Sequence, residues 1–440
     1  MATAAPLRDE TEEMMTPAHR FKRVSVIGLG YIGLPTAAVF ASRGIEVIGV
    51  DVNEIAVQTI NKGRIHIVEP DLDMVVHAAA REGRLRATLR PEPADAFLIA
   101  VPTPFRDGHE PDLSYIEAAA NAIAPVLAKG NLVVLESTSP VGTTEQIAAW
   151  LAQARPDLSF PQDAGEAADI AVAYCPERVL PGHVLRELVE NDRVIGGLTP
   201  RCSAEAVSLY STFVKGECVV TSARTAEMCK LTENAFRDVN IAFANELSII
   251  CDKLDISVWE LIRLANRHPR VNILQPGPGV GGHCIAVDPW FIVNRSPEEA
   301  RLIHTARQVN DSKPHWVVEK VLAAARAVAA RKGCTPDQVR VATFGLAFKP
   351  DIDDLRESPA VDIVKELATH FTRPLLVVEP NIAVLPPALA ACGVELIDGF
   401  AALDQADVWT LLVDHRPFKT VSPKRRDGVE IVDARGIWTD

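Results

Sequence analysis

The sequence has 440 residues, a formal net charge of −13 and 23% charged residues. A chain of this length exceeds one ordinary hydrophobic core, so two or three domains are expected. The acidic balance argues against non-specific binding to nucleic acid or to an anionic membrane, and an anionic substrate would need locally clustered Lys and Arg. No apolar run reaches the roughly 18 residues of a membrane span, so no membrane partner is expected.

The first residues and the cysteines indicate the cellular compartment. Residues 1–20 contain acidic side chains and no apolar segment, so we expect a disordered extension rather than a signal peptide. The eight cysteines show no CxxC spacing and no regular repeat. A reduced cytoplasmic protein fits this pattern better than a disulfide scaffold or a zinc site, and no metal is expected.

A dinucleotide-binding pattern occupies residues 23–51. A β-rich run leads into GLGYIG, a helical stretch follows, and a second strand ends at Asp51. Gly28, Gly30 and Gly33 would let backbone N–H groups and a helix N-terminus meet a pyrophosphate. Asp51 would accept a hydrogen bond from a ribose 2′-hydroxyl and repel a 2′-phosphate, which favours NAD over NADP. The alternative is a glycine-rich turn followed by a surface aspartate.

Further strands, at 96–101, 131–136, 169–175 and 193–197, alternate with helical segments, which predicts a doubly wound parallel sheet. Ligands of such sheets bind at the carboxyl ends of the strands. The polar side chains best placed there for a nicotinamide are Thr103, Thr138, Thr144 and Glu177. Each of them could instead be a helix cap or a turn residue.

One long helix is predicted from Thr225 to Leu254, because apolar residues recur at helical spacing with no Gly or Pro between them. Such a helix can bridge two domains and supply a dimer surface. Lys230 and Asn234 share one face of it, and Arg237 extends that face. From the residues alone, a solvated edge is the favoured interpretation of this polar face.

The stretch 264–290 places a single thiol after a glycine-rich loop. Gly277, Gly279, Gly281 and Gly282 precede Cys284, and glycine lets a backbone approach a ligand closely. The basic residues before the loop are Arg267, His268 and Arg270, and Asp288 follows the thiol. This pattern suits a nucleophile that faces a polar substrate. The alternative is a structural cysteine in a tight turn.

The α/β alternation begins again at about residue 315, and its first loop puts Lys349 and Arg356 at the ligand edge of a second sheet. The predicted fold class is therefore α/β, with two doubly wound parallel-sheet (Rossmann-like) domains joined by a central long helix. The predicted segments are the disordered extension 1–20, a dinucleotide-binding domain 21–214, a central helical domain 215–314 with the cysteine loop and a dimer surface, and an α/β domain 315–440.

Six ordered blocks carry a resemblance to a known family: GLGYIGLP, ESTSPVGTTE, YCPERVLPG, TAEMCKLTENAFRDVNIAFANEL, NRHPRVNILQPGPGVGGHCIAVDPWF and FGLAFKPDIDDLRESPA. With them the chain resembles the UDP-glucose/GDP-mannose dehydrogenase family from about residue 21 onward. The resemblance implies a four-electron oxidation of the C6 alcohol of a UDP-sugar to a carboxylate, with two NAD⁺ reduced. It also implies that residues 315–440 bind the UDP-sugar, and a homodimer is expected.

The resemblance also implies residue roles, and it replaces the solvated-edge interpretation of Lys230 and Asn234. Cys284 would capture the aldehyde as a thiohemiacetal and later carry a thioester. Lys230 and Asn234 would stabilise the oxyanion, Asp288 and a water held by Thr138 would transfer protons, and Glu177 would assist hydrolysis. The implied cofactor positions, besides the glycines, are Tyr31, Ile32, Asp51, Thr103, Thr144 and Arg356. The implied substrate positions are Arg178, Val179, Lys230, Asn234, Arg237, His268, Arg270, Gly281, Phe348 and Lys349.

The resemblance also implies UDP-N-acetyl-D-mannosamine as the substrate, and its product would suit a bacterial surface polysaccharide. Oxidation of UDP-N-acetylglucosamine or UDP-glucose at C6 is the alternative, since spacing cannot distinguish C2 epimers. A two-electron dehydrogenase of the 6-phosphogluconate type would not need Cys284. A catalytically silent nucleotide-sugar-binding protein would not need Asp51 together with the glycine turn.

Overall fold

The computed structural model describes residues 20–67, 69–179, 182–282, 284–397, 401–420 and 428–438. The predicted disordered extension lies outside the described residues, apart from its last residue, Arg20. The chain divides into two compact units, Met1–Pro104 with Asp112–Met228 and Phe105–Pro111 with Cys229–Asp440. Among the described helices, none is both long and apolar enough to span a membrane.

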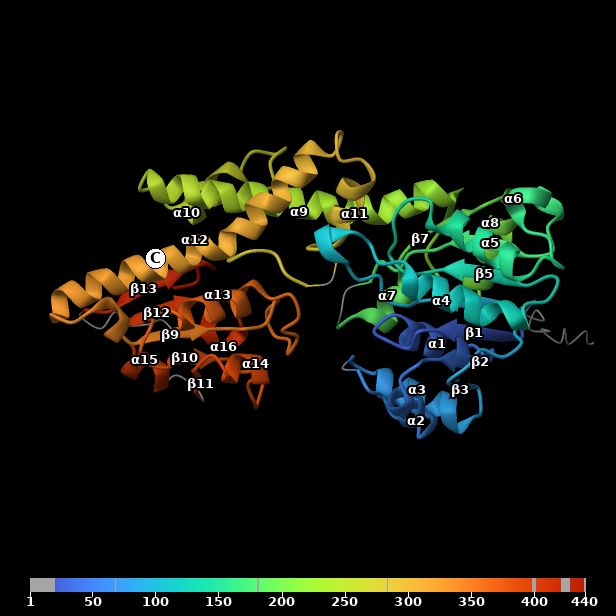
Figure 1. Cartoon of the computed structure of the whole chain (residues 1–440), viewed down its shortest axis with the longest axis horizontal. Helices are drawn as coiled ribbons and strands as arrows, with labels where there is room; N and C mark the ends of the chain where they lie inside the picture. The colour runs from blue at the N-terminus through green and yellow to red at the C-terminus, as the bar shows by residue number, and fades with distance from the viewer. Residues whose placement is uncertain are drawn as a thin grey trace, which may run out of the picture. The chain divides into compact units, whose positions relative to one another are not determined.

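The described part of the first unit is built on one sheet, whose strand order is β3-β2-β1-β4-β5-β6-β7-β8 (Figure 1, blue to green). Every neighbouring pair in it is parallel except β6 and β7, which pair antiparallel. Its strands are β1 (Arg23–Ile27), β2 (Glu46–Val50), β3 (Leu85–Thr88), β4 (Ala96–Ile99), β5 (Leu132–Leu135), β6 (Ala171–Tyr174), β7 (Arg193–Gly197) and β8 (Cys218–Ser222).

Helices cover both faces of this sheet, which is why the central strands β4, β5 and β6 are buried along their whole length. One core lies under α1, α3, α7 and α8, and the other under α4 and α5. The helices of the unit are α1 (Gly33–Ser42), α2 (Glu54–Asn61), α3 (Leu72–Arg81), α4 (Ser114–Ile123), α5 (Thr143–Ala154), α6 (Pro161–Ala164), α7 (Val184–Glu190) and α8 (Pro200–Tyr210), with the 3₁₀ turns η2 (Ala124–Val126) and η3 (Gly165–Ala167).

Two edge strands of this sheet are absent from the sequence predictions. β3 alternates buried and half-buried residues over only four positions, and β8 leaves Val219 and Val220 exposed. Neither segment has the continuous apolar run that marks the buried central strands. Both strands are held by pairing to one neighbour at the sheet edge rather than by a strong local pattern.

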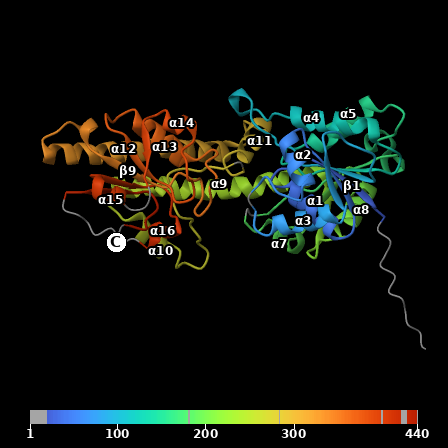
Figure 2. The ribbon, with the colours of Figure 1, turned by 90° about the horizontal axis from the view of Figure 1, so that it is seen from below.

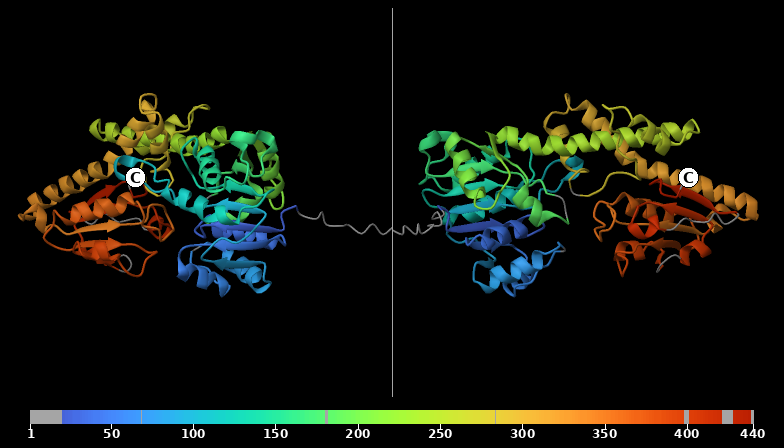
Figure 3. Two further views of the ribbon diagram at one scale, coloured as in Figure 1. Left: turned by 45° about the vertical axis from the view of Figure 1, so that its right-hand side comes forward. Right: turned by 180° about the vertical axis from the view of Figure 1, so that it is seen from behind.

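The long helix α9 (Ala223–Lys253) is present close to its predicted bounds, and Figure 3 shows it as one unbroken helix. Most of its length belongs to the second unit. Next to it in sequence is α10 (Val258–Ala265), which buries Val258 and Ile262 in a small core with Cys251 of α9.

The described part of the second unit contains a five-stranded parallel sheet in the order β11-β10-β9-β12-β13 (Figure 1, orange to red). Its strands are β9 (Val341–Phe344), β10 (Leu375–Val378), β11 (Val394–Leu396), β12 (Val408–Leu411) and β13 (Glu430–Asp433). The other helices are α11 (Asp288–Arg295), α12 (Arg301–Lys332), α13 (Pro359–Ala368), α14 (Pro387–Ala390), α15 (Ala401–Gln405) and α16 (Arg416–Lys419), with η1 (Asp107–His109) and η4 (Pro336–Gln338).

Helix α12 packs on α13 and on the edge formed by β12 and β13 (Figures 1 and 2). It begins at Arg301 and continues through Pro314, so one helix spans the 314/315 position where the sequence suggests a new domain. Proline inside a helix removes one backbone hydrogen bond. A Cβ atom at Gly279 would lie 3.1 Å from Cγ of Pro314, so the proline ring lies beside the glycine loop.

The predicted fold class is confirmed: two α/β units with parallel sheets and a long helix in the middle of the chain. The departure from an all-parallel first sheet is the antiparallel pairing of β7 with β6.

Candidate active site

The glycine turn of the first unit forms as a tight connection between β1 and α1. Gly28 has φ +92°, and its N–H donates to the carbonyl of Val50 at 2.8 Å. A Cβ atom at Gly28 would lie 2.6 Å from the Ala100 carbonyl oxygen, and one at Gly33 would lie 1.8 Å from the Gly28 oxygen. A Cβ at Gly30 would meet nothing within 4 Å. The backbone at Gly30 therefore has room for a ligand, whereas the backbone at Gly28 and Gly33 is packed too closely to accept any side chain.

Asp51, directly after β2, supports this turn. Its Oδ2 accepts from the Leu29 N–H at 2.9 Å, and its Oδ1 accepts from the Asn53 N–H at 2.8 Å. The carboxylate is half-buried, so each oxygen keeps acceptor capacity for a ribose hydroxyl. Tyr31 and Ile32 lie in the turn itself, with Tyr31 exposed.

The threonines after β4 and β5 differ in how their hydroxyl groups are engaged. The Thr103 hydroxyl is buried and has no hydrogen-bond partner among the described residues. Thr144 donates both its backbone N–H, at 2.8 Å, and its hydroxyl, at 2.6 Å, to Glu227. Glu227 also accepts from the Gly142 N–H, and burial raises the pKa of its carboxyl while these three donors lower it. Thr138 is half-buried in the same loop.

Glu177, after β6, is buried beside a buried arginine. Its Oε2 lies 2.9 Å from Nη1 of Arg193, and its Oε1 accepts from the Arg178 N–H at 2.7 Å. Arg193 also lies over the rings of Tyr210 and Phe213. Arg178 and Val179 follow as half-buried residues of the same loop. The carboxylate of Glu177 is thus fixed in place and charge-compensated.

Taken together, these residues fit a nicotinamide dinucleotide. The cradle that a Cβ would fill at Gly28 and Gly33, the open backbone at Gly30 and the unpartnered Thr103 hydroxyl all lie at the carboxyl edge of the sheet. The glycine turn and Asp51 would hold the pyrophosphate and a ribose.

In the second unit, Cys284 lies where the glycine loop enters α11. The N–H of Asp288, the first residue of α11, donates to the Cys284 carbonyl at 2.9 Å. Asp288 is buried, and its Oδ2 accepts from Nδ2 of Asn234 at 2.5 Å. The side chains of α9 and the cysteine loop are therefore joined by a direct hydrogen bond.

Charge around the thiol acts in both directions. Cys284 has an exposed surface, yet the protein packed around it raises the pKa of its thiol, and the Asp288 carboxylate adds to that increase. Lys230, Arg237 and Arg356 lower the same pKa. Burial raises the pKa of Asp288 to about 6, although Lys230 and Asn234 act against the increase. A thiol, a cation, an amide donor and a carboxyl are thus brought together.

The glycine loop fits against the first loop of the second sheet. A Cβ at Gly281 would lie 2.2 Å from the Glu357 carbonyl oxygen, and one at Gly282 would lie 2.8 Å from Cε2 of Phe348. Phe348 and Lys349 are half-buried in that loop. Gly281 and Phe348, both predicted as substrate positions, are therefore packed together.

The other predicted positions are less closely connected. Arg356 is exposed and binds the Asp354 carboxylate through two nitrogens, at 2.8 and 2.6 Å. His268 and Arg270 are exposed after α10, and the Arg270 N–H donates to Nδ1 of His268 at 3.3 Å. No described contact connects them to Cys284. Among the described residues, no group of three or more His, Cys, Asp or Glu side chains is arranged to hold a metal.

Three supporting residues are missing from the sequence predictions. Glu227 holds the start of α5, Arg193 holds Glu177, and Asn245 accepts from the Gly277 N–H at 2.9 Å. Glu227 and Asn245 lie inside a helix that the sequence does predict, but nothing local marks them as different from surface polar residues, whereas Arg193 lies in a predicted strand. A charged residue in the apolar run of β7 is the one available signal.

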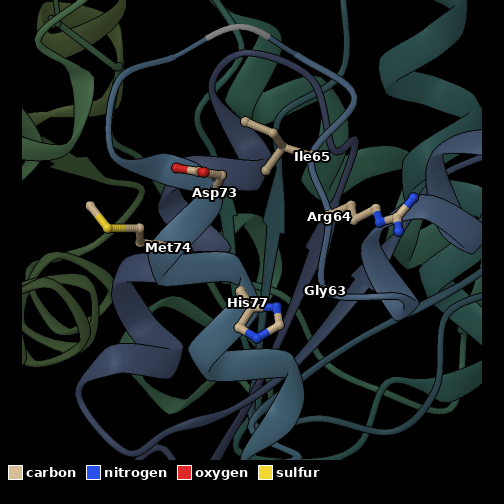
Figure 4. Close-up of a pocket in the computed structure, with 6 residues that line it drawn as sticks. All are labelled: Gly63, Arg64, Ile65, Asp73, Met74 and His77. Atoms are coloured by element: carbon tan, nitrogen blue, oxygen red, sulfur yellow. The ribbon is translucent and has the colours of Figure 1, made fainter.

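A separate cavity of about 390 Å³ lies between the turn after α2 and the helix α3 (Figure 4). Its lining residues are Gly63, Arg64, Ile65, Asp73, Met74 and His77. None of the predicted site residues lines it, so the cavity is distinct from the residues predicted to bind cofactor and substrate.

A glycine turn with an acid after the second strand, and a thiol beside a lysine, an amide and a carboxyl, define a nicotinamide-dependent oxidoreductase. Three family models match the chain: the NAD binding domain of the UDP-glucose/GDP-mannose dehydrogenase family at residues 22–214, its central domain at 224–312 and its UDP binding domain at 342–440. The chain belongs to the UDP-glucose/GDP-mannose dehydrogenase family, which confirms the resemblance seen in the sequence.

Individual relatives are similar over nearly their whole length. The UDP-N-acetyl-D-mannosamine dehydrogenase of Yersinia pestis is 66% identical over 95% of this chain and 99% of its own. The NDP-N-acetyl-D-galactosaminuronic acid dehydrogenase of Ralstonia nicotianae is also 66% identical, over 95% and 97%. The solved UDP-D-ManNAc dehydrogenase of Pyrococcus horikoshii is 37% identical, with a TM-score of 0.82 over 94% of this chain and 96% of that one.

Proposed function

We propose that the protein oxidises the C6 alcohol of UDP-N-acetyl-D-mannosamine to the carboxylate, which consumes one water and reduces two NAD⁺ while three protons are released. The observation that carries the proposal is the cluster of Cys284 with Lys230, Asn234 and Asp288 in the second unit. The similarity to the Yersinia pestis enzyme supports the choice of sugar.

NAD⁺ would supply the hydride acceptor for both oxidation steps when bound. Asp51 and the glycine turn would hold it, and the buried Thr103 hydroxyl is available as a further polar contact. Asp288 takes the proton from the C6 hydroxyl, and a water held by Thr138 is assigned a further role in proton transfer. Lys230 and Asn234 stabilise the developing oxyanion, where one preorganised donor contributes about 3–4 kcal/mol.

Cys284 then forms a bond to the aldehyde carbon, and the aldehyde oxygen becomes the hydroxyl of a thiohemiacetal. This adduct loses its hydroxyl proton together with a second hydride, which leaves a thioester. Glu177 assists attack of water on that thioester, and the C–S bond breaks to release the carboxylate and the thiol. Covalent capture divides a difficult oxidation into two easier steps and retains the aldehyde.

We further propose the domain organisation 21–214 for NAD, 215–314 for the cysteine loop and 315–440 for the UDP-sugar. The matches to the family's NAD binding, central and UDP binding domains support it. Arg178, Val179, Arg237, His268, Arg270, Phe348 and Lys349 are proposed substrate contacts, and Tyr31, Ile32, Thr144 and Arg356 proposed cofactor contacts. A cytoplasmic location is also proposed, because the eight cysteines show no CxxC spacing and no regular repeat, which fits a reducing compartment.

A homodimer through α9 is part of the proposal. Phe236, Phe243 and Ile250 are spaced by seven residues, so they share one face of the helix. Their exposed fractions are 67%, 52% and 44%. An apolar stripe of this length on one helix suits a second copy of the same helix. Sedimentation equilibrium of the Phe243→Glu variant should give a monomer, and an unchanged mass would remove the support that this stripe gives.

Counting NADH per substrate tests the activity. Limiting UDP-N-acetyl-D-mannosamine should yield two NADH per molecule; one would indicate a simple dehydrogenase and none a binding protein. The similarity to the Ralstonia enzyme makes an NDP-N-acetyl-D-galactosamine sugar the second candidate. This sugar, UDP-N-acetylglucosamine and UDP-glucose should each show a lower kcat/KM, since a site whose polar groups match one sugar leaves some of those groups unpaired with another. A higher kcat/KM for any of them would change the substrate and leave the four-electron chemistry in place.

A further inference from the structure

The glycine turn after β1 in the first unit and the glycine turn after β9 in the second unit have the same backbone geometry. In the first, Gly28 has φ +92° and its N–H donates to the carbonyl of Val50 at 2.8 Å. In the second, Gly345 has φ +96° and its N–H donates to the carbonyl of Val378 at 2.9 Å. In each case a glycine after one strand contacts the last residue of the next strand.

An acidic residue supports each of these turns in the same way. Asp51 accepts from Leu29 N–H, and Glu379, the residue after β10, accepts from Leu346 N–H at 2.7 Å through Oε2. The second carboxylate oxygen accepts from Asn53 N–H in the first unit and from Asn381 N–H, at 3.0 Å, in the second. Glu379 is therefore the structural counterpart of the ribose-binding acid.

The two acids differ in what else they contact. Asp51 is half-buried, whereas the side chain of Glu379 is 0% exposed. Nε2 of His415, which is also 0% exposed, lies 3.0 Å from Oε2 of Glu379. An imidazole thus occupies the position from which a ribose hydroxyl would have to approach this carboxylate.

The other nitrogen of His415 holds the loop that follows β9. Nδ1 accepts from the Asp351 N–H at 2.9 Å. A backbone N–H can only donate, so Nδ1 is the unprotonated nitrogen and Nε2 donates to Glu379. Asp351 has φ +61°, and its Oδ1 accepts from the Arg416 N–H at 2.9 Å. Asp351 comes two residues after Lys349, so these contacts fix the end of the segment that carries Phe348 and Lys349.

We propose that His415 is a positioning residue for the nucleotide half of the substrate. Its imidazole blocks access of a ribose hydroxyl to the Glu379 carboxylate. Held by that carboxylate, the imidazole accepts from the Asp351 N–H and so keeps residues 346–351 in the conformation that binds the UDP group. In this way a dinucleotide-type turn is converted into a site for a nucleoside diphosphate. The inference rests on the proposed function only in assigning the UDP group to Phe348 and Lys349.

Calorimetric binding of UDP tests the proposal without requiring turnover. His415→Ala should raise the Kd for UDP about tenfold, because the loop loses a buried acceptor. The KM for NAD⁺ and the kcat at saturating substrate should stay within about twofold, since positioning of this loop acts on ground-state binding. His415→Asn returns an acceptor near the Nδ1 position, so its Kd should lie within about threefold of the wild-type value.

Two further variants make the result decisive. His370→Ala removes an exposed histidine of the same unit and should leave the Kd for UDP unchanged. Asp351→Ala keeps the backbone N–H but removes the side-chain contact to the Arg416 N–H and disfavours the positive φ that places the Asp351 N–H at His415. It therefore reports on the same contact even if the His415 variants do not fold, and it should weaken UDP binding several-fold. A wild-type Kd in His415→Ala or in Asp351→Ala would overturn the proposal, as would a His415→Asn variant no better than His415→Ala. A wild-type protein that binds no UDP would instead contradict the proposed function.

Discussion

Asn234 of α9 donates a hydrogen bond of 2.5 Å to the carboxylate of Asp288, which opens α11 four residues after Cys284. This contact joins the helix that carries Lys230 to the loop that carries the thiol. It also supplies a donor to a buried carboxyl whose pKa burial raises to about 6. A carboxyl that titrates there can exchange a proton with substrate near neutral pH.

The pH dependence of turnover should therefore follow Asp288. If its carboxylate is the base, kcat/KM should fall as the pH drops through about 6, because the protonated acid can no longer accept a proton. Asp288→Asn should lower kcat by about 10²-fold and remove this acidic limb. Initial rates of NADH formation from pH 5 to 8 check it. Full activity in Asp288→Asn would assign proton transfer to another group.

The same carboxyl should affect stability with a definite sign. Its pKa in the folded protein, about 6, exceeds the ordinary value of 3.8, so between these values the folded state holds a proton that the unfolded chain has released. Its favourable contribution is complete below pH 3.8 and is lost as the pH rises through about 6, a change of about 3 kcal/mol. The free energy of unfolding of Asp288→Asn, relative to wild type, should increase between pH 4 and 7. Parallel pH curves for the two proteins would contradict this.

Cys284→Ala should abolish formation of the carboxylate, by about 10³-fold or more, because no thiol remains to capture the aldehyde. Binding of NAD⁺ should persist, since Asp51 and the glycine turn are untouched. Intact-mass spectrometry of the wild type during turnover should show a covalent adduct that the variant lacks. Cys392→Ala, which removes another exposed thiol of the same unit, is the matched control and should retain full activity. Turnover by Cys284→Ala would make the residue structural.

Asp51→Asn should reduce cofactor selectivity. The single oxygen of an amide cannot accept from both backbone N–H groups and a ribose hydroxyl, so kcat/KM for NAD⁺ should fall about tenfold. An amide also does not repel a 2′-phosphate, so the preference for NAD⁺ over NADP⁺ should become smaller. Asn53→Ala is a suitable control, because Asn53 caps α2 and its loss should cost about 1 kcal/mol of stability without changing the cofactor ratio. Unchanged selectivity in Asp51→Asn would remove the basis for the NAD preference.

The sequence predicts the elements whose pattern is local. The buried central strands, the α9 helix and the glycine turn each carry their signal within about 30 residues, and the structure contains all of them. The strands β3 and β8 and the continuation of α12 through Pro314 depend on neighbours elsewhere in the chain, so local pattern does not reveal them.

The residues of the candidate site also differ in whether a local sequence pattern reveals them. Cys284, Asp288 and Lys230 are recognisable as chemical groups, and family motifs select them. Residues such as Arg193 and His415 act through contacts with carboxylates that are 16 and 36 positions away in sequence. A lone polar residue gives no sign of its partner until the sheet brings the two together, because long-range pairing has no local signature.

The loop that leads to the thiol is held by a buried hydrogen-bond network between α9 and α12. Asn245 of α9 accepts from the Gly277 N–H at 2.9 Å and donates to Asn310 of α12, which in turn donates to Asp238 at 2.8 Å. Arg307 of α12 completes the network with a 2.6 Å contact to Asp238. All four side chains are buried. Such a network fixes the loop that leads to Cys284 relative to the helix that carries Lys230.

Asn245→Ala would leave the Gly277 N–H and the side-chain carbonyl oxygen of Asn310 unpaired, which costs about 1–3 kcal/mol per buried group. We expect a lower Tm, a kcat reduced by about tenfold or more, and a changed rate of Cys284 alkylation by iodoacetamide, because the thiol moves relative to Lys230 and Arg237. Asn240→Ala is the matched control: its amide bonds the Phe236 carbonyl of its own helix, so alkylation and kcat should match the wild type. If Asn245→Ala lowers the Tm but leaves both rates unchanged, the network stabilises the fold without positioning the nucleophile.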